Sequence, residues 1–336
     1  MPSITIRDIA ERARVSVSTV SLVLRDSPLI KAETRERVQK AAAEIGYVYN
    51  RSAASLRSRQ TGVVGLCVND LTNPYFAEMV AGIERALYAL GRTVLMTDAQ
   101  EDPVRQCAFI EKMQEYSVDG LLLSPAHTID AVLLESLVRK ARMPCVLVSR
   151  DLPGSGLDYA GYDHRHGMVL AVEHLIASGH RRIALMGGFH TTWVGSERVK
   201  GYRQALAGAG IPHDPALEIE SPLTRQDGMR IIDQVLSQPH PPTAAACAND
   251  VFAIGVMLGL RRHGLEAGRD FAVTGNDNIA EAALWTPSLS TVVTDFEVIG
   301  REAVSMLQER IECPSLPPRR LVLPVHLEVR DSSKAH

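Results

Sequence analysis

Residues that could contact DNA gather on one face of a short helix predicted near the N-terminus. Val20, Val23 and Leu24 have the i, i+3, i+4 spacing of an inward-facing helical stripe. The opposite face then carries side chains that the core does not use, which are Val17, Ser18, Ser21 and Leu22. Hydroxyl and small apolar groups presented in this way can contact phosphates and base edges.

The segment before this helix completes a helix-turn-helix pattern. Ile6, Ile9, Ala10 and Ala13 give an earlier helix one apolar stripe, and Ser16 stands where a side chain can cap the second helix. In a helix-turn-helix the second helix enters the DNA major groove. The same spacing also fits an ordinary three-helix core with no nucleic-acid role.

Two further segments follow before residue 61. A third helix is expected over about 32–45, with Gly46 as its C-terminal stop. Residues 50–59 are short, basic and alanine-rich, with one large apolar residue, Leu56. Because this segment has almost nothing to bury, it is either a plain linker or folds on binding a partner.

The charge is divided unevenly along the 336 residues. Residues 1–60 hold 11 Lys and Arg against 6 Asp and Glu, a net +5, while the remainder has a net −8. This division fits phosphate contact by the N-terminal part alone, although a few surface lysines would also produce it. The length exceeds what one hydrophobic core usually serves, so two or three domains are expected.

Cysteine use and hydropathy predict a cytoplasmic protein without membrane contact. The five cysteines are scattered and never form C-x-x-C, which favours reduced thiols over disulfides or a zinc site. No apolar run reaches the roughly 18 residues of a membrane span, and the N-terminus lacks the apolar region of a secretory signal. We expect no metal ion and no cofactor.

From residue 61 onward, short apolar runs alternate with amphipathic helical stretches. The runs are residues 63–68, 93–96, 120–123, 145–148, 183–186, 244–248, 271–273 and 291–293. This alternation predicts an α/β fold with parallel sheets covered by helices on both faces. The runs are too many for one sheet and the pattern restarts after Asp163, so we expect two lobes with a small-molecule site between them.

A series of short motifs along nearly the whole chain resembles the lac repressor family of bacterial transcription regulators. The motifs are residues 5–10 (TIRDIA), 15–21 (VSVSTVS), 34–38 (TRERV), 46–51 (GYVYNR), 70–76 (DLTNPYF), 179–183 (GHRRI), 198–202 (RVKGY), 248–250 (AND) and 275–277 (GND). Their order and spacing make the resemblance specific. Within the family, residues 18–24 are similar to the maltose-regulon repressor branch.

The resemblance implies an all-α helix-turn-helix head on a two-lobed, doubly wound α/β body like that of periplasmic sugar-binding proteins. Residues 1–48 would form the head, 49–60 a hinge helix or linker, and 61–336 the effector-binding and dimerisation body. The N-lobe would comprise about 61–162 and 292–323, and the C-lobe about 163–291 and 324–336. No leucine heptads follow near the C-terminus, so we expect a homodimer without a tetramerising coil.

The resemblance also assigns residues to a pseudo-palindromic DNA operator. Base edges would be faced by Val17, Ser18 and Leu22. Phosphates would be contacted by Thr5, Ser16, Thr19, Ser21 and Thr34. Leu22 departs from the Arg that is usual in the family and cannot make a bidentate guanine contact, so the operator should differ at that base pair.

Four more DNA contacts are implied at the end of the head and in the hinge. Arg25 replaces a usual Asn and could contact a phosphate. Asn50, Ala53 and Leu56 would lie in the minor groove, where Leu56 would act as a wedge that opens a base step and kinks the duplex. The alternative for this segment is an alanine-rich linker.

For the effector, the resemblance and the loops on the predicted cleft side give one set of residues. They are Asn73, Tyr75, Phe76, Arg150, Trp193, Arg198, Leu223, Asn249, Asp277 and Trp285. Arg198, Asn249 and Asp277 together could bracket vicinal hydroxyls, which suits a sugar or polyol. Each Trp could stack on a sugar or serve the core, Asn249 could be a helix cap, and Asp277 a turn residue.

These observations predict a transcriptional repressor whose operator affinity is controlled by a small molecule, a sugar or polyol, bound between the lobes. One alternative is a purine or sugar phosphate acting as co-repressor. Another is a two-lobed solute-binding protein, which the head and the missing signal sequence argue against. An enzyme is not expected, because no phosphate-loop, dinucleotide, nucleophile-elbow or zinc-protease motif occurs.

Overall fold

The computed structural model describes residues 4–24, 27–47 and 60–334. The chain forms two compact units, the first ending at Thr61 and the second beginning at Gly62. The predicted DNA contacts Arg25, Asn50, Ala53 and Leu56 lie outside the described residues.

The described residues of the first unit, the head, form three helices, α1 (Ile6–Ala13), α2 (Val17–Leu24) and α3 (Ala32–Glu44). Ile9, Val20 and Val38 are fully buried and join the helices in one small core. Thr5 forms a capping box with Asp8 at the start of α1. The predicted inward stripes of both helices are confirmed.

The second unit, the body, contains two six-stranded sheets. The N-lobe sheet has the order β11 (Arg320–Leu323), β5 (Asp158–Tyr162), β4 (Cys145–Val148), β3 (Gly120–Leu123), β1 (Val63–Val68) and β2 (Thr93–Asp98), with every neighbouring pair parallel. The C-lobe sheet has the order β12 (His326–Glu328), β10 (Ser290–Val293), β9 (Ala272–Asp277), β8 (Ala244–Cys247), β6 (Ile183–Met186) and β7 (Glu218–Ile219). There β12 is antiparallel to β10 and the other pairs are parallel.

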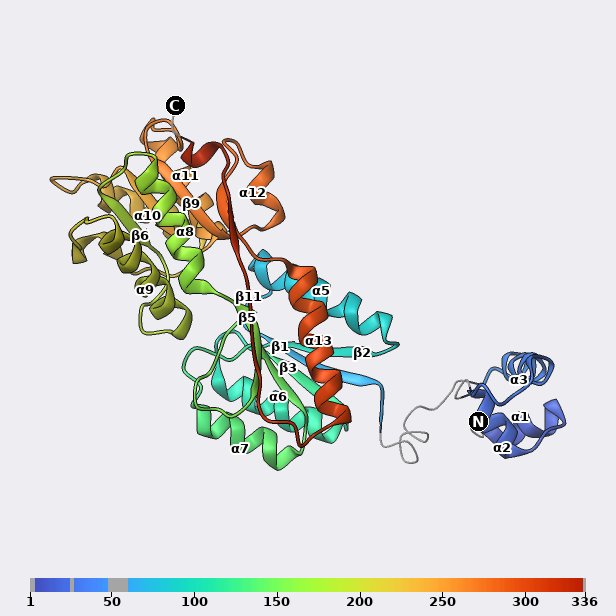
Figure 1. The fold of residues 1–336 in the computed structure, drawn as a ribbon. Helices are drawn as coiled ribbons and strands as arrows, with labels where there is room; N and C mark the ends of the chain where they lie inside the picture. Colours follow the sequence, from blue (N-terminus) through green and yellow to red (C-terminus); the bar gives the residue numbers. More distant parts are fainter. Residues whose placement is uncertain (1–3, 25–26, 48–59, 335–336) are drawn as a thin grey trace. The chain divides into compact units, whose positions relative to one another are not determined.

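Helices cover both faces of each sheet (Figure 1). In the N-lobe, α5 (Pro74–Ala89) and α13 (Phe296–Glu312) pack on one face, and α6 (Pro103–Glu115) and α7 (Ala131–Ala141) on the other. In the C-lobe, α8 (His164–Ala177) and α9 (Trp193–Gly208) lie opposite α10 (Arg225–Leu236) and α11 (Asp250–Arg262). The shorter helices are α12 (Ala280–Leu284), η1 (Pro215–Leu217) and η2 (Asp331–Ser333). The predicted doubly wound α/β fold is confirmed.

The chain passes between the lobes three times: after β5, after β10, and between β11 and β12. The second passage lies after Val293, slightly later than the boundary expected at 292. The strand runs on because Val292 and Val293 still pair with Asn276 and Asp277 of β9.

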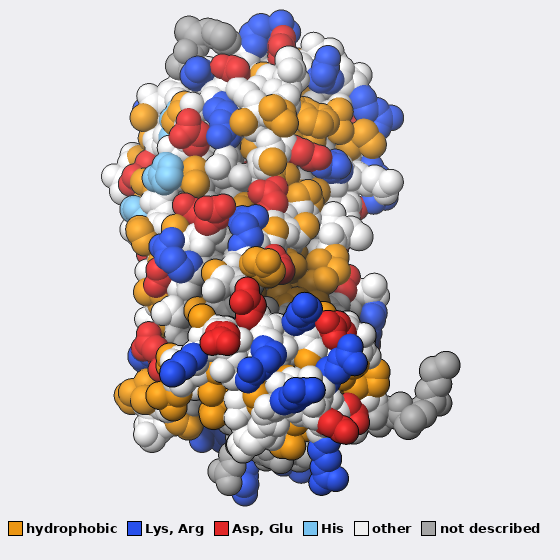
Figure 2. All heavy atoms as spheres, turned by 90° about the vertical axis from the view of Figure 1, so that its right-hand side faces the viewer, with side chains coloured by type: hydrophobic (Ala, Val, Ile, Leu, Met, Phe, Trp, Pro, Cys, Tyr) orange, Lys and Arg blue, Asp and Glu red, His pale blue; other side chains and the backbone are white. Residues whose placement is uncertain are grey.

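Acidic and basic side chains are interspersed on the face drawn in Figure 2, with hydrophobic side chains between them. Among the described residues, no helix combines the length and the apolar composition that crossing a membrane requires.

Candidate functional site

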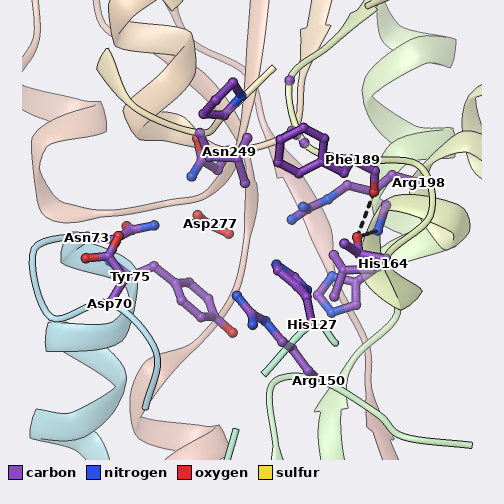
Figure 3. Close-up of a pocket in the computed structure, with 18 of the residues that line it drawn as sticks. Asp70, Asn73, Tyr75, His127, Arg150, His164, Phe189, Arg198, Asn249 and Asp277 are labelled. Atoms are coloured by element: carbon purple, nitrogen blue, oxygen red, sulfur yellow. Dashed lines mark hydrogen bonds between the residues drawn. The ribbon is translucent and has the colours of Figure 1, made fainter. Parts of the chain in front are cut away.

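A cavity opens between the lobes where the carboxyl ends of the strands from both sheets meet. It brings together eight of the ten predicted effector residues: Asn73, Tyr75, Phe76, Arg150, Arg198, Leu223, Asn249 and Asp277. Figure 3 shows six of them, Asn73, Tyr75, Arg150, Arg198, Asn249 and Asp277, around the cavity. Helices α5, α9 and α11 each begin in a loop that follows a strand, and residues at their starts line the cavity. This is the usual position of ligands in doubly wound sheets.

Arg198 and Asp277 are buried groups of opposite charge on the wall of the cavity. Arg198 on α9 is 8% exposed and Asp277 at the end of β9 is 4% exposed. The Arg198 Nε has no hydrogen-bond partner among the described residues. Burial lowers the pKa of Arg198, and burial together with the neighbouring Asp250 raises the pKa of Asp277 well above its ordinary value. Both groups face the cavity and are suited to a ligand that donates and accepts hydrogen bonds (Figure 3).

The backbone at Asp277 is held in an unusual conformation. Its φ of 129° lies in a region that side-chain-bearing residues rarely adopt. The Thr294 hydroxyl donates to the Asp277 carbonyl oxygen at 2.7 Å, and the Asn276 amide donates to the Asp277 carboxylate at 3.1 Å. These contacts fix the carboxylate beside the cavity and hold the strained backbone in place.

Two asparagines act both as helix caps and as cavity walls. The Asn249 side-chain oxygen accepts the Phe252 N–H at 2.9 Å at the start of α11, and the Asn73 oxygen accepts the Tyr75 N–H at 3.1 Å at the start of α5. In both residues the cap uses the oxygen, so the amide N–H groups remain for a ligand.

An ion pair forms the N-lobe wall. Arg150 donates to both carboxylate oxygens of Glu101, at 2.9 and 2.8 Å, and its guanidinium lies 5.5 Å from the centre of the Phe76 ring. Glu101 also accepts the backbone N–H of His127 at 3.1 Å. Burial and the Arg150 charge lower the pKa of His127 to about 4, so its imidazole is neutral at pH 7.

A second hydrogen-bonded chain runs along the base of the cavity. The Tyr75 hydroxyl donates to the Ser149 hydroxyl at 2.7 Å, and burial raises the pKa of Tyr75 to about 12. The Ser149 carbonyl lies 3.2 Å from His164 Nε2, whose pKa burial lowers to about 3. His164 is therefore neutral and holds one tautomer, with its proton on the nitrogen that faces the carbonyl.

The two tryptophans are not among the cavity-lining residues. The Trp193 ring packs edge-on against His164 at 5.6 Å and Tyr159 at 5.8 Å, because the first turn of α9 directs it toward β5 of the N-lobe. Trp285, directly after α12, packs against the main hydrophobic core. Both rings therefore make the structural contacts that the sequence left open as the alternative to sugar stacking, and Trp193 supports the cavity wall through His164.

The outer face of α2 presents the side chains predicted to meet DNA. Val17 is 39% exposed, Ser18 is exposed, and Ser21 and Leu22 are half-buried. Ser16 accepts the Thr19 backbone N–H at 3.1 Å, as expected for a cap.

The hydroxyls predicted to contact phosphates already take part in local hydrogen bonds or are partly covered. The Ser16 hydroxyl lies 2.8 Å from the Thr19 hydroxyl, and the Thr5 hydroxyl donates to Asp8 at 2.9 Å. Thr34 on α3 is half-buried.

Comparison with known proteins gives the family. Residues 5–50 match the model of bacterial regulatory proteins of the lacI family, and residues 172–333 match the periplasmic binding protein-like domain. The HTH-type transcriptional repressor PurR of Erwinia tasmaniensis is 34% identical over 312 residues, covering 91% of this chain and 90% of the relative. The chain belongs to the lacI family of bacterial regulatory proteins.

Solved structures agree over the full length. The lac repressor dimer bound to operator and the anti-inducer ONPF has a TM-score of 0.87 at 27% identity, covering 99% of this chain and 100% of that one. A complex of the transcriptional regulator CelR with cellobiose has a TM-score of 0.74 at 31% identity, covering 98% and 99%. This lacI-family protein is therefore a DNA-binding transcriptional repressor under small-molecule control, and its relatives are repressors rather than enzymes.

The cavity of this lacI-family protein also contains residues that sequence reasoning missed. They are Asp70, Glu101, His127, Phe189, His190 and Thr192. Phe189 is 47% exposed and is an aromatic ring in the loop between β6 and α9. Its position directly after a buried strand was the available signal. The sequence offered no such signal for Glu101, because only the fold brings its carboxylate to Arg150.

Proposed function

We propose that this protein is a homodimeric repressor of a pseudo-palindromic operator, and that a neutral sugar or polyol in the cleft controls its operator affinity. We infer the ligand class from two buried charged groups, Arg198 and Asp277, that face one cavity. A guanidinium only donates and a carboxylate only accepts, whereas each hydroxyl of a sugar does both. Two neighbouring hydroxyls could therefore serve both groups at once.

The charge balance of the cavity favours a neutral ligand over a phosphate or carboxylate. Arg150 is engaged by Glu101, and Arg198 is offset by Asp277. His127 and His164 are neutral near pH 7. A phosphate group is usually held by cations that are free to pair with it. This argues against the alternative sugar-phosphate ligand.

Apolar side chains in the same cavity would meet the C–H faces of a sugar ring. Phe189, Phe76 and Leu223 line it, and the exposed Phe189 ring supplies the stacking surface that was first expected of the tryptophans. Two similar structures support this choice: CelR was solved with cellobiose, and a LacI-family regulator from Enterococcus faecium with ribose.

On the DNA side, Val17, Ser18 and Leu22 remain our proposal for contacts to base edges. The exposure of Val17 and Ser18 supports it, and Leu22 would touch a thymine methyl rather than a guanine. The operator-bound dimer of the lac repressor supports a two-fold operator for a homodimer. The protein would act in the cytoplasm, where the DNA is, and would release its ligand chemically unchanged.

Thermal unfolding of the purified protein against neutral sugars, polyols, sugar phosphates and purines tests the ligand class. A ligand at about 100 times its Kd should stabilise the protein by roughly 2.7 kcal/mol. We expect hits among neutral sugars or polyols that shrink by at least about 1 kcal/mol in Asp277→Asn and persist in full in Asp270→Asn, a surface control. Hits confined to sugar phosphates or purines would overturn the proposed class.

A further inference from the structure

The place where the chain leaves the body for the head is held by a buried carboxylate. The Gly62 N–H donates to Asp119 Oδ2 at 2.9 Å, and the Gly62 carbonyl accepts the Thr93 N–H at 2.8 Å. The Asp119 N–H donates to the carbonyl of Val63 at 2.8 Å. The first residue of the body is thus tied to the loop before β3 and to the start of β2.

Asp119 is in turn tied to the ends of two helices. Arg92, just after α5, donates to Asp119 Oδ2 at 2.7 Å and, through its other terminal nitrogen, to Gln308 of α13 at 2.7 Å. The side chains of Arg92 and Asp119 are only 9% and 2% exposed. A guanidinium fork buried between two acceptors fixes their relative positions far better than a surface ion pair does.

The other ends of the same two helices reach the effector cavity. Asn73, Tyr75 and Phe76 at the start of α5 line it, and Phe296 at the start of α13 packs edge-on against Tyr75 at 5.5 Å. Between these ends the backbones touch, because a Cβ added to Gly300 would lie 2.4 Å from the Gly82 carbonyl carbon. Figure 1 shows α5 and α13 side by side. The 16 residues of α5 span about 24 Å.

We propose that Arg92, Asp119 and Gln308 are positioning residues. They hold Gly62, where the chain leaves the body for the head, to the paired helices α5 and α13. A shift of this helix pair at its cavity end therefore moves Gly62. The inference rests on the cavity being the effector site, as proposed above, but not on the effector being a sugar. Packed helices with backbone contact move as one body, which makes them suited to carry such a displacement.

The test compares variants that cut this link without leaving a bare buried charge. Gln308→Met removes the acceptor on α13, and Arg92→Lys keeps the charge but cannot fork between two acceptors. Each protein is titrated with a duplex selected from a random-sequence pool by the wild type, alone and with cellobiose or D-ribose as probe. We expect the operator Kd to change about three- to thirtyfold in both variants, and any probe-induced change in Kd to shrink.

Controls separate positioning from general damage. The Glu312 carboxylate accepts a hydrogen bond from the Gln308 amide at 2.6 Å on the surface of α13. Glu312→Ala removes this contact and leaves the one between Gln308 and Arg92, so this variant should bind the operator like the wild type. Gln308→Glu restores an acceptor for Arg92 and should recover the operator affinity. Gln308→Met removes the acceptor of a buried guanidinium N–H, so its melting temperature should fall by a few degrees. Binding to an unrelated duplex should stay at the wild-type level in every variant, which general damage to the fold would not predict.

Two results would overturn the proposal. One is an operator affinity within twofold of wild type in both Gln308→Met and Arg92→Lys, and the other is a loss of operator affinity accompanied by an equal fold-loss of binding to the unrelated duplex. If neither probe raises the wild-type melting temperature, that result counts against these sugars as effectors. The probe-free operator affinities then still decide the role of the three residues.

Discussion

Replacing Asp277 by Asn should make the ligand-free protein more stable while removing its response to the effector. The carboxylate is buried and its pKa is raised by burial and by Asp250, so its charged form is unfavourable in the folded state. Asn has nearly the same shape as Asp and the same Cβ, so the backbone strain at this position is unchanged by the substitution. Removing this buried charge should stabilise the ligand-free body by about 1–3 kcal/mol at pH 7, because the cost of burying the carboxylate exceeds the attraction of Arg198.

The pH dependence of the free energy of unfolding tests the same prediction independently. Because the folded protein holds the Asp277 proton more tightly than the unfolded chain, the stability due to this group is full below the unfolded pKa of about 3.9 and is lost as the pH rises through the higher folded pKa. Asp277→Asn should remove this loss. Effector binding that uses the ionised carboxylate should weaken in the wild type as the pH falls through the raised pKa.

The assay is chemical denaturation and ligand titration of both proteins across pH. The lost hydrogen bond to a charged acceptor is worth about 1.5–3 kcal/mol, or roughly 10- to 150-fold in effector Kd. In the control Asp270→Asn the sign reverses, because Arg269 lowers the pKa of the exposed Asp270 and stabilises its charged form. An Asp277→Asn protein that is less stable than wild type, or that keeps the effector affinity, would refute the reasoning.

Three other substitutions test the head, the hinge and the cavity wall. Leu22→Arg should create a guanine preference of about 1–3 kcal/mol at one operator position, and selection of random duplexes that returns the wild-type sequence would contradict the assignment. Leu56→Ala should weaken operator binding while leaving effector binding intact; equal operator affinity would remove the wedge role. Trp193→Ala should destabilise the body by about 2–4 kcal/mol in urea unfolding, with Trp193→Phe retaining most of the stability, because the ring packs between His164 and Tyr159. A ring that served only to stack on the ligand would leave stability unchanged.

Much of the fold could be predicted because buried parallel strands are apolar and their covering helices are amphipathic. β5 has no such run: its sequence is Asp-Tyr-Ala-Gly-Tyr, and its buried Asp158 is compensated by Arg310, 152 residues later, at 2.8 and 2.9 Å. β9 continues for four residues beyond the predicted Val273, through Gly275 and the buried polar side chains of Thr274, Asn276 and Asp277. Contacts across such sequence separations leave no local pattern.

The candidate site also contains residues that local sequence could predict and residues that only contacts between distant segments bring together. Asn73 and Asn249 could be predicted because each follows a strand and begins a helix, and that position faces the cleft in any doubly wound lobe. Trp193 follows the same rule but its ring lies against the N-lobe, because its direction depends on how the lobes meet. Glu101 and His127 reach Arg150 from two other loops, so the sequence shows three ordinary polar residues where the fold builds one wall.

The most direct test of the central claim is the operator affinity of the wild type and of Asp277→Asn, each measured with and without the neutral sugar or polyol that raises the melting temperature most. The account predicts that the ligand changes the wild-type operator Kd by about fivefold or more and leaves that of Asp277→Asn unchanged. An equal ligand-induced change in both proteins would show that the ligand acts elsewhere and would contradict the account.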